Sequence, residues 1–299
     1  MSVDVQARLR AALASVTHAL GAAGIVSASA EARTLLAHAA RCDGPLVLLD
    51  ALPETFDADL DAAVARRVRR EPLQLIVGTA PFRRLSLRTR PGVFIPRPET
   101  ELAIDVLHAH LATTGEKELL IWDLCTGSGT LGAAVVDELP RAHLVGVELD
   151  ASAAELAREN IASAAHPGAP GTWEVRQGDV TDTALISGLP GADGSVDAIL
   201  ANPPYIPAAA VPRDAEVADW DPHRALYGGG EDGLDVPRAV IAAAARALRP
   251  GGLLVMEHAD VQGEASRAIA EASGAFEDVE TVRDLTGRDR FLAARRARN

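Results

Sequence analysis

The spacing of hydrophobic positions changes about a third of the way along the chain. In the first seventy residues apolar side chains recur at helical intervals, as at Leu9, Leu13 and Val16, and glycines then interrupt this first run. The expected helices lie at about residues 2–20, 30–40 and 57–69. Three short helices bury only a small core, so we predict a small helical domain over residues 1–70.

Short extended runs follow this helical region. Residues 73–77 and 85–89 have the composition of strands, and a turn region separates them at residues 78–84. We expect a β-hairpin here, within a linker over residues 71–98 that joins the helical domain to a second domain over residues 99–299.

From about residue 118 the pattern becomes a repeat of strand, loop and helix. The expected strands lie at residues 119–124, 144–147, 172–175, 196–201 and 253–256, and the expected helices at residues 131–139, 151–164 and 236–248. A helix at about residues 99–110 precedes them, and a strand pair at residues 276–281 and 291–294 is expected to follow. Such alternation predicts an α/β fold with a parallel, doubly wound sheet covered by helices on both faces.

Composition narrows the class of protein. A length of 299 residues suggests about two domains, and 29 Lys and Arg against 42 Asp and Glu give a formal net charge of −13. Binders of duplex DNA carry a basic surface, so this charge counts against a nucleic acid as the main partner. Two cysteines are too few for a disulfide framework, and no apolar run approaches the ~20 residues of a membrane span. Because residues 1–10 also lack the pattern of a secretory leader, we expect a cytoplasmic globular protein.

A glycine-rich loop follows the first expected strand of the α/β region. The sequence Asp-Leu-Cys-Thr-Gly-Ser-Gly at residues 123–129 precedes a helix, whose free N–H groups can face a ligand that the glycines allow to approach closely. Gly127, Gly129 and Gly132 fit the pattern G-x-G-x-x-G. Glu148 ends the next strand roughly 20 residues on, where an acidic side chain holds ribose hydroxyls. Two ligands fit this loop, a dinucleotide and S-adenosylmethionine.

The sequence Asn-Pro-Pro-Tyr at residues 202–205 follows the fourth strand and distinguishes between these ligands. Ligands of open α/β sheets bind beyond the carboxyl ends of the strands, so the tetrapeptide is expected beside the glycine loop. An amide nitrogen is a poor nucleophile and must be held with its lone pair facing a sulfonium methyl group. The side-chain oxygen of Asn202 and the carbonyl of Pro203 can each accept one N–H, and Tyr205 offers a flat face for stacking. This chemistry favours methyl transfer to a planar nitrogen, without a metal or a strong base.

Several motifs resemble those of the HemK/PrmC family of protein-(glutamine-N5) methyltransferases, and they extend over nearly the whole chain. They are Glu-Pro-Leu-Gln at residues 71–74, Pro-Gly-Val-Phe-Ile-Pro-Arg-Pro-Glu-Thr-Glu at residues 91–101, the glycine loop at residues 123–129, Asn-Pro-Pro-Tyr-Ile at residues 202–206, Gly-Gly-Gly-Glu-Asp-Gly-Leu-Asp at residues 228–235 and Arg-Pro-Gly-Gly at residues 249–252. The resemblance implies a Rossmann-like domain that binds S-adenosylmethionine at residues 99–299 and a helical N-terminal domain that docks the substrate. It also implies the reaction, methylation of the glutamine in the Gly-Gly-Gln motif of class-1 peptide chain release factors, which modulates translation termination.

The resemblance further implies which residues form the site. The implied cofactor-binding residues are Asp123, Cys125, Thr126, Gly127, Ser128, Gly129, Glu148, Asp179, Val180 and Asn202. The methionine end of the cofactor is expected over residues 126–129, the ribose at Glu148, and the adenine near Asp179 and Val180. The implied glutamine pocket consists of Asn202, Pro203, Pro204, Tyr205 and Phe94, with Asn202, Pro203 and Tyr205 as catalytic residues.

The chain departs from the family pattern at four positions. Cys125 stands where many members have glycine, which is tolerable if its φ angle stays negative. Leu75 replaces a frequent tyrosine, and Val180 replaces an aromatic residue of some members. Glu148 replaces the commoner aspartate with equivalent chemistry.

Other interpretations fit parts of the sequence. A glutamine methyltransferase of a ribosomal protein is one alternative, and a nucleic-acid adenine-N6 methyltransferase, which can use a similar tetrapeptide on a flipped base, is another. The net charge disfavours the second, so no sequence-specific nucleic-acid binding is expected. From a different class, an NAD-dependent oxidoreductase fits the G-x-G-x-x-G pattern. Glu257 and His258 are interpreted as polar residues at the pocket rim, because the chemistry needs no base, and no metal site is expected.

Overall fold

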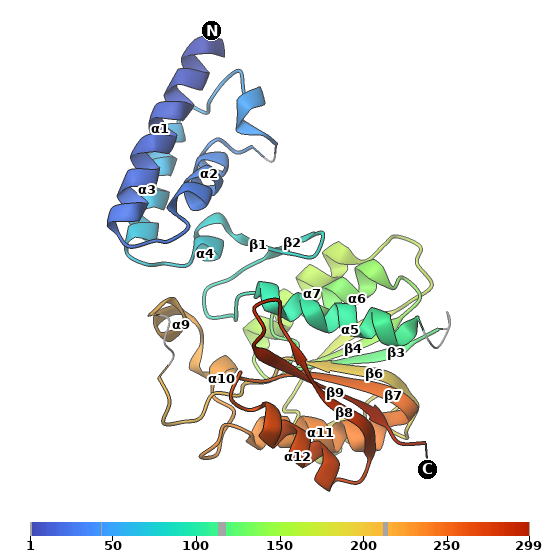
Figure 1. Cartoon of the computed structure of the whole chain (residues 1–299). Helices are drawn as coiled ribbons and strands as arrows, with labels where there is room; N and C mark the ends of the chain where they lie inside the picture. Colours follow the sequence, from blue (N-terminus) through green and yellow to red (C-terminus); the bar gives the residue numbers. More distant parts are fainter. Residues whose placement is uncertain (1, 43, 113–117, 212–214, 299) are drawn as a thin grey trace. The chain divides into compact units, whose positions relative to one another are not determined.

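The computed structural model describes residues 2–42, 44–112, 118–211 and 215–298. The chain forms two compact units (Figure 1). Unit 1 consists of Met1–Thr79 and Pro212–Trp220, and unit 2 consists of Ala80–Val211 and Asp221–Asn299. Unit 1 therefore includes a segment from the second half of the sequence.

Unit 1 is helical. Its helices are α1 (Ser2–Ala22), α2 (Ala28–Ala39), α3 (Phe56–Val68), α4 (Leu73–Val77) and α9 (Ala215–Trp220), with a 3-10 turn η1 (Leu46–Leu48). The first three confirm the expected helices, and Leu20, Leu35 and Phe56 are completely buried in their common core. Arg67 is buried as well, and its guanidinium pairs with the carboxylates of Glu31 at 2.5 Å and Glu216 at 2.9 Å. These two partners compensate a buried charge that would otherwise be costly.

The prediction that residues 73–77 are extended is wrong. They form the single-turn helix α4, which begins after Pro72 and ends at Gly78, whose φ of 80° is the left-handed conformation that closes many helices. The hairpin lies just beyond, as β1 (Thr79–Phe82) and β2 (Leu85–Arg88). A five-residue segment with four apolar residues fits a strand and a helical turn equally, so periodicity could not separate them.

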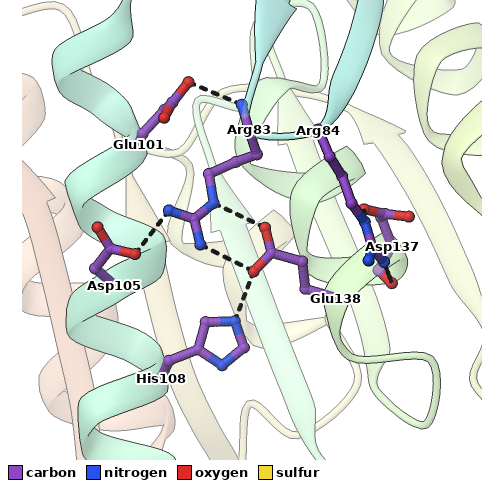
Figure 2. A network of polar contacts seen from close by, with 7 residues as sticks. All are labelled: Arg83, Arg84, Glu101, Asp105, His108, Asp137 and Glu138. Carbon is purple, nitrogen blue, oxygen red and sulfur yellow. Dashed lines mark hydrogen bonds and ion pairs between the residues drawn. The ribbon is translucent and has the colours of Figure 1, made fainter.

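The tip of this hairpin is tied to the helices of unit 2 (Figure 2). The Arg83 guanidinium donates to both carboxylate oxygens of Glu138, at 2.8 and 3.1 Å, and to Asp105 at 2.7 Å. Arg84 pairs with Asp137 at 2.5 Å. Asp105 belongs to α5 (Leu102–Leu111), which follows the short turn η2 (Pro98–Glu101), and Glu138 ends α6 (Thr130–Glu138). Bidentate pairing of this kind fixes direction as well as distance, so the tip is held firmly on α5 and α6.

Unit 2 contains a seven-stranded sheet with the order β5-β4-β3-β6-β7-β9-β8. The strands are β3 (Leu120–Leu124), β4 (His143–Glu148), β5 (Trp173–Gln177), β6 (Val196–Ala201), β7 (Leu248–Glu257), β8 (Phe276–Arg283) and β9 (Asp289–Arg296). The first five in this order are parallel, and β9 joins β7 and β8 antiparallel. The predictions of a doubly wound parallel sheet and of a terminal strand pair are confirmed.

Helices cover both faces of this sheet (Figure 1). On β3, Ile121 packs with α5, α6 and α7 (Ala151–Ala164), whereas Trp122 and Leu124 pack on the opposite face with α8 (Thr183–Ser187) and α11 (Asp235–Ala247). Two further helices are α10 (His223–Leu226) and α12 (Gly263–Ala272). Strands that are buried on both faces have nearly continuous apolar sequences, which explains why their positions could be predicted. Within the described ranges, no helix has both the length and the apolar character needed to cross a membrane.

Candidate active site

The carboxyl ends of the parallel strands meet at one edge of the sheet. Leu124 at the end of β3 is the register partner of Ala201 at the end of β6, so the glycine loop and the Asn202–Tyr205 segment begin side by side. From β3 the chain proceeds to β4 and β5 on one side, and β6 and β7 lie on the other. This reversal makes the β3–β6 gap the switch point at which open α/β sheets bind their ligands.

Hydrogen bonds to the Asp123 carboxyl hold the glycine loop in place. One of its oxygens, Oδ2, accepts hydrogen bonds from the Thr126 hydroxyl and from the Gly132 amide at 2.9 Å. The other, Oδ1, is buried and has no hydrogen-bond partner among the described residues. Burial raises the pKa of this carboxyl to about 7. An unsatisfied buried oxygen requires a donor, and here a ligand can supply one.

The glycines of the loop serve two different purposes. A Cβ on Gly129 would lie 2.8 Å from the Ala157 Cα, so this glycine allows α6 and α7 to pack closely. A Cβ on Gly127 would meet nothing within 4 Å, although its φ of +58° favours glycine. Ser128, between them, is buried, and its carbonyl accepts from the Asn160 side chain at 2.9 Å. The open space over Gly127 is the part of the loop that a ligand can occupy.

Cys125 does not meet the condition under which it was expected to be tolerated. Its φ is +60°, in the left-handed region, where a side chain is strained and glycine is not. Burial and the carboxylates of Glu148, Asp123 and Asp179 raise the pKa of its thiol. A thiol held neutral in this way is a poor nucleophile.

Glu148 caps the loop from the end of β4. Its Oε2 accepts from the Gly127 amide at 2.9 Å and its Oε1 from the Asp150 amide at 2.8 Å. Burial raises the pKa of this carboxyl. Beyond β5, Asp179 is exposed and accepts from Thr181, whereas the Val180 side chain is buried. These residues extend the site along the sheet edge from β3 towards β5.

The Asn202–Tyr205 segment follows β6, which lies on the opposite side of β3 from β4 and Glu148. The side-chain nitrogen of Asn202 is 3.4 Å from the Thr100 hydroxyl oxygen, and Pro203 is buried. Pro204 and Tyr205 are half-buried, and the Tyr205 hydroxyl donates to Glu257 at 3.3 Å. Burial and the Glu257 carboxylate raise the pKa of Tyr205, so its hydroxyl stays protonated.

The Gly-Gly-Gly-Glu-Asp-Gly motif wraps around this segment. A Cβ on Gly233 would lie 2.2 Å from the Tyr205 carbonyl oxygen, and one on Gly228 would lie 2.5 Å from the Pro204 carbonyl oxygen. The Gln262 side chain donates to the carbonyls of Tyr205 and Asp232, each at 2.8 Å. The motif therefore holds the backbone of the tetrapeptide and needs glycine to come this close.

Phe94 is half-buried and contacts a charged neighbour. The Arg97 guanidinium carbon lies 5.2 Å from the centre of its ring, and Arg97 also pairs with Asp221 at 2.5 Å. Cation–π contact of this kind fixes the ring orientation. A place for Phe94 in a substrate pocket stays a prediction.

The sequence does not predict the contacts of three residues at the site. Thr100 and Gln262 were not singled out, although Thr100 lies in the Pro-Arg-Pro-Glu-Thr-Glu motif. Glu257, for which the sequence predicts a place at the pocket rim, is buried and contacts both Thr100 and Tyr205. The sequence feature that indicates a place at the site for Glu257 is its position at the end of a parallel strand, since ligands bind at these strand ends.

The chain matches two family models and several named relatives over most of its length. Residues 11–78 match the PrmC N-terminal domain and residues 84–216 match the Methyltransferase small domain. The chain is 42% identical to the release factor glutamine methyltransferase of Bifidobacterium longum, covering 91% of this chain and 94% of the relative. It is also 42% identical to the release factor glutamine methyltransferase of Mycolicibacterium smegmatis, covering 97% and 98%. Among solved structures, the T. thermophilus 16S rRNA N2 G1207 methyltransferase in complex with AdoMet and guanosine is similar with a TM-score of 0.49 and 24% identity, over 73% of this chain and 49% of that one.

Proposed function

The chain belongs to the release factor glutamine methyltransferase family, and from this premise we propose that it methylates the side-chain amide nitrogen, N5, of the glutamine in the Gly-Gly-Gln motif of class-1 release factors. Its methyl donor is S-adenosylmethionine. The observation that carries the site assignment is the register of β3 and β6, which sets the glycine loop and Asn202 at adjacent strand ends. A methyl donor on the first and an amide acceptor on the second would meet at the switch point.

The residues of the glycine loop fit this cofactor. The free Oδ1 of Asp123 is suited to a cationic N–H donor, and the open face of Gly127 leaves room for the methionine end. Glu148 is suited to the ribose hydroxyls, and Asp179 and Val180 lie on the side where the adenine would follow. S-adenosylmethionine supplies an electrophilic methyl group when bound.

The Asn202–Tyr205 segment holds the acceptor. The Asn202 Oδ1 and the Pro203 carbonyl each accept one of the two N–H groups of the glutamine amide, which leaves the nitrogen lone pair directed at the donor. The same two oxygens would stabilise the positive charge that develops on the nitrogen. The methyl group would come from the cofactor as its S–CH3 bond breaks, which leaves S-adenosylhomocysteine, and the methylated nitrogen would release one proton to solvent. Tyr205 stacks against the planar carboxamide, and the two prolines keep the backbone rigid.

The proposal is tested by mapping the product. The purified protein is incubated with labelled S-adenosylmethionine and a class-1 release factor, and the modified residue is located by mass spectrometry. We expect the label on the Gly-Gly-Gln glutamine, and Asn202→Ala should lower kcat by about 10²-fold, as the loss of an oriented polar group does. A label on another residue, or no label on any release factor, would contradict the proposal.

A second measurement separates the cofactor classes. Calorimetry with S-adenosylhomocysteine and with NAD should show micromolar binding of the first only. Binding of NAD in its place would return the chain to the oxidoreductase alternative.

A further inference from the structure

A buried carboxyl group lies behind the Asn202–Tyr205 segment in unit 2. Glu257 is 2% exposed at the end of β7 and accepts a hydrogen bond from the Thr100 hydroxyl at 2.7 Å. It accepts a second from the Tyr205 hydroxyl at 3.3 Å. Because Ala201 and Met256 are register partners, Glu257, the last residue of β7, lies level with Asn202, the residue that follows β6.

Two hydrogen bonds, both made by the Thr100 hydroxyl, connect Glu257 to Asn202. An ionised carboxylate only accepts, so Thr100 commits its single hydroxyl hydrogen to Glu257. The Thr100 oxygen then acts as an acceptor, and the Asn202 side-chain nitrogen donates to it at 3.4 Å. An amide whose nitrogen is bound in this way keeps its oxygen free to accept an N–H from another molecule.

We infer that Glu257 is a positioning residue for glutamine methylation, which acts through Thr100 to fix the orientation of the Asn202 amide and through Tyr205 to hold the stacking ring. The inference rests on the proposed function, because the orientation matters only if Asn202 Oδ1 accepts the substrate N–H. Glu257 itself needs no contact with the glutamine. Burying a carboxyl group costs folding free energy that an apolar side chain at the same position would avoid. Packing alone therefore does not explain a glutamate at this position.

Charged groups from several elements face the Glu257 carboxyl. Glu99 of η2 repels it, and Arg290 of β9, itself paired with Asp284 at 3.1 Å, attracts it. The neighbouring His258 directs its ring to the Ala259 carbonyl at 2.8 Å. Burial outweighs the Thr100 hydrogen bond and Arg290, and it raises the pKa of Glu257 to about 7.

Because Thr100 bonds both Glu257 and Asn202, the protonation of Glu257 makes the orientation of the Asn202 amide sensitive to pH. Below about pH 7 the protonated Glu257 can donate to Thr100, whose own hydrogen is then free to turn to Asn202. The Asn202 amide then no longer has a fixed orientation. Methylation should therefore increase as the pH rises through about 7.

Three substitutions test the inference, each measured for kcat, for KM towards a release factor, for the Kd of S-adenosylhomocysteine and for Tm. Thr100→Val keeps the shape and removes the hydroxyl, and should lower kcat by about tenfold, the effect of losing one hydrogen bond from the transition state. Thr100→Ser retains the hydroxyl and should restore kcat. Glu257→Gln keeps the shape but can donate, so it should lower kcat at pH 8 by a similar factor and abolish the rise in rate near pH 7. The Kd of S-adenosylhomocysteine should change far less than kcat in all three, because Asn202 is only one of the ten implied cofactor-binding residues.

The outcomes separate this inference from the proposed function. A wild-type protein that binds S-adenosylhomocysteine but leaves release factors unmethylated overturns the proposed function and this inference with it. The inference alone is overturned if the wild type methylates release factors and Thr100→Val retains full kcat. It is also overturned if Glu257→Gln has the same pH profile as the methylating wild type. If Glu257→Gln fails to fold, the Thr100→Val and Thr100→Ser pair and the wild-type pH profile decide.

Discussion

Cys125 shows how one residue can carry strain inside a binding loop. Its φ of +60° costs an L-residue roughly 1–2 kcal/mol, and glycine avoids this cost. The thiol contributes some packing against the apolar cluster below the loop. The strain is therefore measured best between two variants that both lack the thiol.

We predict that Cys125→Gly is more stable than Cys125→Ala. Relief of the left-handed strain exceeds the extra entropy of glycine in the unfolded chain, for a net gain of about 1 kcal/mol. Urea unfolding of the two variants measures this difference. Equal stabilities, or a more stable alanine variant, would show that the backbone at residue 125 is not strained.

Asp123 gives a second prediction at the scale of a residue. Its pKa is raised to about 7 in the folded protein from an ordinary value of 3.8. Its contribution to stability is therefore full below about pH 4 and is lost as the pH rises through about 7. Asp123→Asn cannot ionise and should not show this loss.

The measurement is the free energy of unfolding of wild type and of Asp123→Asn at pH 5 and pH 8. We expect the wild-type value to fall relative to that of the variant by roughly 2–3 kcal/mol across this interval. Parallel pH profiles of the two proteins would mean that Asp123 ionises normally.

At the scale of elements, the connections after β6 and before α11 depend on each other. A Cβ on Gly228 would lie 2.5 Å from the Pro204 carbonyl oxygen, and one on Gly233 would lie 2.2 Å from the Tyr205 carbonyl oxygen. Gln262, which precedes α12, donates to the carbonyls of Tyr205 and Asp232 and so joins the two connections. The tetrapeptide thus derives its rigidity from its two prolines and from this second loop. A change in the second loop should therefore impair the reaction without touching the substrate.

We predict that Gly233→Ala lowers kcat on a release factor by at least about tenfold, because a Cβ there would displace the Tyr205 backbone, and misplacement by ~1 Å can cost ~10² in rate. Gly274→Ala is a matched control, since its φ of +65° is similar to the +76° of Gly233 but nothing lies within 4 Å of its Cβ. Both variants should lose about 1–2 kcal/mol of stability from positive φ alone. If both had the same kcat, the second loop would have no role in holding Tyr205.

At the scale of the whole molecule, local patterns predicted the elements and long-range contacts completed the site. The central strands could be predicted because continuous apolar runs mark strands buried on both faces, and the glycine loop and Asn202 followed from their strand ends. The Thr100–Glu257 hydrogen bond joins residues 157 positions apart, and no local pattern indicates it. The same holds for Glu216 of α9, which pairs with Arg67 across 149 positions within unit 1.

Some predictions at this scale go beyond the contacts described. Docking of the release factor by residues 1–70 stays a prediction, as do the individual contacts of the site residues with cofactor and substrate. They all depend on one claim, that Asn202 and Pro203 together hold a glutamine amide with its nitrogen facing the methyl donor.

A structure of the protein with S-adenosylhomocysteine and a release factor tests this claim most directly. We expect the glutamine nitrogen to lie within ~3 Å of both Asn202 Oδ1 and the Pro203 carbonyl oxygen, with its remaining face towards the cofactor sulfur. An Asn202 side chain turned away from the amide, or a glutamine nitrogen facing away from the sulfur, would contradict it.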